Sequence, residues 1–145
     1  MTEAVLLAVA RCFRNWLETA DFANAPGSLS SFPAECCSWA CYFLGAFVKE
    51  EMGLAPVRVQ GARGADNHEW IQVDDFTIDI TSDQFADSDA RVVVATSSVW
   101  HDGWKIESTQ SVSPISDYGR VARGGQRRPP KIYKLLAATA RFHLT

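Results

Sequence analysis

The spacing of apolar residues changes from helical to alternating after Gly53, and this change restricts the chain to a mixed fold. Before Gly53, apolar residues recur at helical intervals over residues 3–20 and again from about Cys36 to Met52. A further helix is expected near the end of the chain, over 131–143. Short β-branched or alternating runs predict strands at 57–60, 68–73, 76–81, 91–95 and 104–107. Helices first and antiparallel strands afterwards predict an α+β fold.

The length and composition indicate one globular domain, residues 1–145. A chain of 145 residues, of which 47% are hydrophobic and 21% charged, can build a core of its own. No stretch approaches the roughly eighteen apolar residues that cross a membrane. We therefore expect a single domain that does not insert into a membrane.

The four cysteines are Cys12, Cys36, Cys37 and Cys41, and three of them lie within six positions. Such crowding is a poor way to cross-link a fold. No secretory segment is recognised, because the N-terminus carries Glu3 and no early Lys or Arg. We therefore expect free thiols and a location in the reducing cytoplasm.

The charges are distributed unevenly although the net charge is only −3. All 17 acidic residues lie at or before Asp117, whereas residues 119–145 carry seven Lys and Arg and no acid. This basic C-terminal segment could contact nucleic acid or an acidic partner, or it could only offset the acidic body. The second interpretation is favoured because no aromatic stacking motif or DNA-binding pattern accompanies the charges. Nucleic acid is therefore not an expected partner.

A candidate nucleophile lies at the start of the second predicted helix. Unpaired N–H groups at a helix N-terminus favour a thiolate, and Cys37 has this position. Cys36 stays the alternative, because either residue could lie in the first turn. The chain has three histidines, and His68 opens a predicted strand after a glycine-containing loop. His68 is therefore the candidate base.

The predicted hairpin brings a carboxylate to the candidate base. If Asp74-Asp75 is a two-residue turn, Val73 pairs with Phe76, and His68 and Asp79 fall on the same, polar face. Their backbones would then be roughly 7–8 Å apart as diagonal neighbours, within reach of their side chains. A carboxylate at this position can fix the tautomer of the imidazole and stabilise the imidazolium.

Three segments resemble the transglutaminase-like branch of the papain-like cysteine protease superfamily, and in particular its short bacterial members. They are FPAECCSWACYFLGAFVKEEMG, VRVQGARGADNHEW and FTIDITSDQF, and together they cover roughly residues 32–85. The family order is a cysteine that opens a helix, then His-x-Trp on a strand, then Asp-x-Thr on the next strand. The resemblance implies a nucleophile helix packed on a small antiparallel sheet with flanking N- and C-terminal helices. It also implies a catalytic triad of Cys37, His68 and Asp79.

The chain departs from the family pattern at two positions. Glu35 stands where a small residue is common, and Glu69 replaces the usual alanine between the histidine and the tryptophan. The second change places an acid beside the base, where it could alter the pKa of the base or the substrate preference. Neither change removes a catalytic group.

Four further residues are candidates for substrate contact, namely Cys36, Trp70, Gln84 and Trp100. Trp70 could shield the histidine–aspartate pair from water or be part of the core. Asp83 and Gln84 could line the cleft or cap a turn, and the cap is slightly favoured. The segment 98–101 could form a substrate wall, but His101 is expected to lie in a loop without a catalytic role.

A zinc site built from Cys36, Cys37, Cys41 and His68 is the structural alternative for this cluster. It is disfavoured because the chain has no second cysteine pair of zinc-site spacing. No metal or other cofactor is therefore expected.

These observations predict a cysteine-dependent enzyme that hydrolyses or transfers an amide or related acyl bond. Peptidase, amidase, deamidase and transglutaminase activities all remain open, and the partner is a peptide, a protein or a small amide. A delivered effector is one way in which such domains are used. The alternative is a binding or immunity-type module that keeps the fold without turnover.

Overall fold

The computed structural model describes residues 2–19, 32–33, 36–115 and 129–144. In these residues the fold is mixed α+β, with four α-helices and a five-stranded antiparallel sheet of order β4-β3-β2-β1-β5. The predicted α+β class is thereby confirmed. The elements are α1 (Glu3–Thr19), α2 (Cys37–Glu50), β1 (Val57–Arg63), β2 (Asp66–Val73), β3 (Phe76–Asp79), η2 (Ser82–Gln84), β4 (Val93–Ala95), α3 (Val99–Asp102), β5 (Lys105–Ser111), α4 (Pro129–Ala140) and η4 (Arg141–Leu144).

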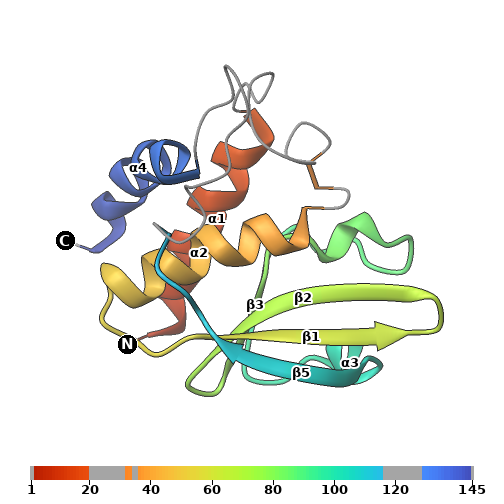
Figure 1. Cartoon of the computed structure of the whole chain (residues 1–145). Helices are drawn as coiled ribbons and strands as arrows, with labels where there is room; N and C mark the ends of the chain where they lie inside the picture. The colour runs from red at the N-terminus through yellow and green to blue at the C-terminus, as the bar shows by residue number, and fades with distance from the viewer. Residues whose placement is uncertain (1, 20–31, 34–35, 116–128, 145) are drawn as a thin grey trace.

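The helices α1, α2 and α4 cover one face of the sheet, whereas α3 lies beyond the opposite face (Figure 1). The main core fills the space between α1, α2, α4 and the sheet, and Phe13 and Phe47 meet edge to face at its centre. Helix α2 packs closely on the strands at Gly45. A Cβ atom there would lie 2.8 Å from the Ile71 side chain, which explains a glycine inside a helix. The predicted helix at 36–52 is therefore anchored to the sheet along its length.

The β2–β3 hairpin has the predicted turn. Val73 pairs with Phe76, Gln72 with Thr77, and Asp74 takes the left-handed conformation that a tight hairpin turn requires (φ 51°). Alternation along the two strands then brings His68 and Asp79 to the same face of the hairpin.

The β1–β2 hairpin is longer than predicted. The sequence indicated a loop over 61–67, but β1 continues to Arg63 and β2 begins at Asp66, because the turn needs only residues 64–65. Strand β5 likewise continues to Ser111, past the predicted end at 107. Its side chains are mostly polar and exposed, so no apolar alternation marks its full length.

A buried arginine joins α1 to the segment after β3. Arg14 is 3% exposed and donates to both carboxylate oxygens of Asp83, at 2.6 and 2.8 Å, and to the carbonyl of Ile80 at 2.7 Å. Glu18 accepts a further bond at 2.6 Å. Asp83 is thus held by Arg14, a contact that the sequence did not predict. These contacts fix the chain just after the strand that carries Asp79.

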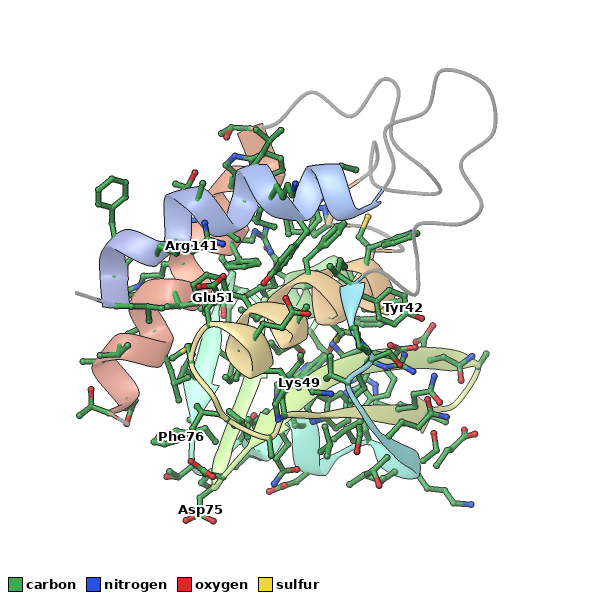
Figure 2. The ribbon with its side chains drawn as sticks, turned by 60° about the vertical axis from the view of Figure 1, so that its left-hand side comes forward. Tyr42, Lys49, Glu51, Asp75, Phe76 and Arg141 are labelled. Atoms are coloured by element: carbon green, nitrogen blue, oxygen red, sulfur yellow. The ribbon has the colours of Figure 1, made fainter. Side chains whose placement is uncertain are left out.

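The C-terminal helix is tied to the end of α2. Arg141 donates to Glu51 at 2.7 Å, and Figure 2 shows the two side chains turned toward one another. Residues 119–128 of the basic segment, which carry four of its seven Lys and Arg, lie outside the described residues. Among the helices described here, none has the length and apolar character needed to cross a membrane.

Candidate active site

The two neighbouring cysteines have different surroundings. Cys36 is 0% exposed at the N-cap position of α2, whereas Cys37 is the first residue of the helix and is partly exposed. All four cysteines of the chain are free thiols. Burial raises the pKa of Cys41 well above its usual value, which makes it an unreactive core thiol. Cys37 is therefore the cysteine of this segment that a substrate can reach.

His68 lies on β2 in an aromatic enclosure. Its side chain is 0% exposed. The ring centroids of four aromatic residues lie 5.1–5.7 Å from its own, and they belong to Trp70, Phe85, Trp100 and Trp104. Such apolar walls exclude water and strengthen the electrostatic interactions of the imidazole.

The residue opposite His68 on β1 is Gly61, and its lack of a side chain has a packing reason. A Cβ atom at Gly61 would lie 2.9 Å from the Trp70 ring and 3.1 Å from the Cβ of Trp104. The glycine therefore allows the enclosure around His68 to close.

Asp79 holds His68 through a short hydrogen bond. Nε2 of His68 lies 2.6 Å from Oδ2 of Asp79. The other carboxylate oxygen, Oδ1, accepts from the backbone N–H of Thr81 at 2.9 Å. Both groups are buried, and the hairpin places them on one face as the sequence predicted. This contact fixes the imidazole as an orienting carboxylate would.

Nδ1, the other ring nitrogen of His68, lies 3.4 Å from the amide nitrogen of Gln84. Cys37 and His68 line the same pocket, and Cys37 is close enough to affect the pKa of His68. Burial alone lowers this pKa. The hydrogen bond to Asp79 and the proximity of Cys37 outweigh burial and raise it to about 9. The imidazolium is thus the favoured form at neutral pH.

The sequence interpretation missed His101, and its expected position in a loop away from the site is wrong. His101 lies on α3, and its Nε2 is 2.7 Å from Oδ2 of Asp79, the same oxygen that His68 contacts. Burial alone raises the pKa of Asp79, but the bonds from His101 and His68 outweigh it and hold this pKa well below its usual range. A helix of four residues has no apolar periodicity, so the sequence carries no signal that would have located it.

A pocket of about 230 Å³ opens beside Cys37. It contains Glu69, whose side chain accepts from Ser38 at 3.0 Å, from Gln60 at 2.9 Å and from Arg58 at 3.1 Å. Glu69 thus holds Ser38, the residue that follows Cys37. The lining residues are Cys37, Ser38, Gln60, Gly61, Asn67, His68, Glu69 and Glu107.

The residues predicted to contact substrate do not line this pocket. Cys36 and Trp70 are buried, at 0% and 3% exposure, and their contact with substrate stays a prediction. Trp70 instead packs against His68 and His101, with centroids 5.7 and 5.0 Å apart. Gln84 touches the imidazole, and Trp100 belongs to the enclosure.

The group of His68, Asp79 and His101 also has the composition of a metal site. Their ligand atoms lie within 4.8 Å of one another. Both imidazoles, however, contact the carboxylate directly at 2.6 and 2.7 Å, and all three side chains are at most 4% exposed. The arrangement therefore suits a hydrogen-bonded relay better than a metal with an open coordination position. The cysteines do not belong to this group, in contrast to the zinc alternative.

The raised pKa of His68 predicts how stability depends on pH. Its pKa is about 9 in the folded protein and near 6.5 when unperturbed, so its stabilising effect is complete below pH 6.5 and is lost as the pH rises to 9. We expect the free energy of unfolding to fall by roughly 2–3 kcal/mol over this range. Denaturant titrations at pH 6.5 and 9.5 measure this decrease. His68→Gln should lack most of it, and an equal decrease in both proteins would contradict the assignment.

Comparison of the chain with protein-family models, curated proteins and solved structures gave no match.

Proposed function

We propose that the protein is a cysteine-dependent acyl-transfer enzyme with a papain- or transglutaminase-like arrangement, in which Cys37, His68 and Asp79 form the triad. The observation that carries the proposal is the 2.6 Å contact between His68 and Asp79, together with Cys37, which lines the same pocket as His68 at the N-terminus of α2. A nucleophile, a base within hydrogen-bond reach and a third group that orients the base are the requirements of covalent catalysis.

In this mechanism Cys37 attacks the carbonyl carbon of the substrate as a thiolate paired with the imidazolium of His68. Negative charge develops on the carbonyl oxygen, where the backbone N–H of Cys37, in the first turn of α2, is a suitable donor. His68 then gives its proton to the leaving amine, and the acyl group stays on Cys37 as a thioester. Water or an amine takes up the acyl group, with His68 as the base and Asp79 orienting the ring.

The pocket indicates the kind of substrate. Its volume of about 230 Å³ suits a compact amide or one exposed side chain of a protein. Its acidic lining residues are Glu69, which is paired with Arg58, and Glu107, and its cationic lining residue is the His68 imidazolium. With these charges nearly balanced, a neutral acyl substrate is favoured.

One observation favours the alternative, a catalytically silent binding or immunity-type module of this fold. The side chain of His68 is 0% exposed although it borders the pocket, so a leaving group has little access to the base. A silent module would keep the polar relay as part of its core. Turnover therefore has to be measured directly.

A panel of small esters, amides and glutamine-containing peptides tests the proposal. We expect release of the leaving group from at least one compound, and release of ammonia from a glutamine peptide would indicate deamidation or transglutamination. The matched control is Cys37→Ala, which should be inactive on every compound. A folded parent protein without turnover above this variant would support the silent module instead.

A further inference from the structure

A second nucleophile–base contact lies on the far side of Asp79. The hydroxyl of Ser98 is 2.6 Å from Nδ1 of His101, and Nε2 of His101 is 2.7 Å from Oδ2 of Asp79. His101 therefore has the same orientation as His68, with Nε2 toward the carboxylate and Nδ1 toward a nucleophilic side chain. Asp79 is common to both contacts.

Helix capping alone does not explain the position of the Ser98 hydroxyl. As the N-cap of α3, this oxygen accepts from the backbone N–H of His101, but at a distance of 3.4 Å. The contact with the imidazole is much shorter, at 2.6 Å. In the tautomer that carries its proton on Nε2, toward Asp79, Nδ1 accepts and the Ser98 hydroxyl donates. In this tautomer the hydroxyl proton is directed at a base.

Ser98 also lies at a pocket of its own. This pocket has a volume of about 510 Å³ and is separate from the Cys37 pocket, with which it shares no lining residue. Ser98 is half-buried, whereas the His101 and Asp79 side chains are 4% and 1% exposed. An accessible hydroxyl, a covered base and a buried carboxylate form the gradient of exposure that a serine nucleophile needs.

We propose that Ser98, His101 and Asp79 form a second acyl-transfer site, with Ser98 as its nucleophile. Ser98 Oγ bonds to the acyl carbon of an ester or amide while its proton passes to Nδ1 of His101. The bond to the leaving alcohol or amine breaks, and that group takes the proton. Water then hydrolyses the acyl-serine with His101 as base. The acidic side chains Asp75 and Asp102 line the pocket, and its described lining has no Lys or Arg, so the substrate is a polar, neutral or cationic acyl compound.

The test uses a tagged fluorophosphonate on the full chain with Cys37→Ala, which removes the other nucleophile. The Ser98 oxygen attacks phosphorus, the P–F bond breaks and fluoride leaves, so that a covalent adduct forms on Ser98. Peptide mapping by mass spectrometry locates the adduct. We expect labelling of Ser98 that disappears with Ser98→Ala and slows by about 100-fold or more with His101→Gln.

The neighbouring serine is the matched control. Ser97 is exposed at the same pocket but is not part of the hydrogen-bonded group of Ser98, His101 and Asp79. Ser98 should therefore be labelled at the parent rate in Ser97→Ala. Thermal unfolding shows which variants keep the fold, and if His101→Gln unfolds, the comparison of Ser98→Ala with Ser97→Ala decides. A folded protein without label on Ser98, or with equal labelling of Ser97 and Ser98, would overturn the proposal. Failure of this labelling experiment would not affect the proposed Cys37 triad, because that triad is tested with variants of a different residue.

Discussion

Replacing Cys37 by alanine is expected to lower turnover by about 10⁴–10⁶-fold on any substrate that the parent protein accepts. In the proposed mechanism the sulfur of Cys37 bonds to the acyl carbon, and no other cysteine of the described segment is placed to replace it. Cys36 is 0% exposed, and Cys41 is a buried thiol of raised pKa. Steady-state kinetics with the best compound of the panel measure the effect.

Cys36→Ala is the control for this substitution. It removes the neighbouring sulfur from the core and should cost about 1 kcal/mol of stability while turnover changes little. If Cys36→Ala abolished activity and Cys37→Ala did not, the nucleophile would be Cys36.

Replacing Arg14 by methionine is expected to lower the free energy of unfolding by about 3 kcal/mol. The arginine is buried and holds both oxygens of Asp83 and one of Glu18, so its loss leaves Asp83 without its cation and Glu18 with Arg91 alone. Its bond to the carbonyl of Ile80 also fixes the chain that follows the Asp79 strand. Denaturant unfolding measures the loss, and turnover should fall with it.

Arg91→Met is the matched control, because Arg91 also pairs with Glu18 but its side chain is 53% exposed. Exposed ion pairs contribute less than about 1 kcal/mol, so this variant should stay close to the parent protein. An equal decrease in the free energy of unfolding of the two variants would mean that burial does not strengthen the contribution of Arg14.

The sequence was sufficient for the parts of the molecule that local patterns determine. Short segments of sequence determine the apolar stripes of α1 and α2 and the two-residue turn at Asp74-Asp75. The structure has these features where they were predicted. The predicted register of that hairpin placed His68 and Asp79 on a common face. The 2.6 Å contact between their side chains confirms this placement.

The rest depends on contacts between distant segments. His101 reaches Asp79 from 22 positions away, through a four-residue helix without periodicity, and Arg14 reaches Asp83 from 69 positions away. No pattern within a short segment of sequence predicts a contact between residues so far apart in the chain. The burial of Cys36 and Trp70 likewise follows from how α2 and α3 pack around the sheet, so their exposure could not be judged from the sequence.

The most direct test of the central claim is the rate at which iodoacetamide alkylates each cysteine at pH 6. An ordinary thiol is almost entirely protonated at this pH and reacts slowly, whereas a thiolate paired with an imidazolium reacts quickly. We predict that Cys37 is modified first in the native protein, and that His68→Gln slows this reaction by at least about tenfold. Equal rates in the two folded proteins, or modification of Cys36 ahead of Cys37, would contradict the account.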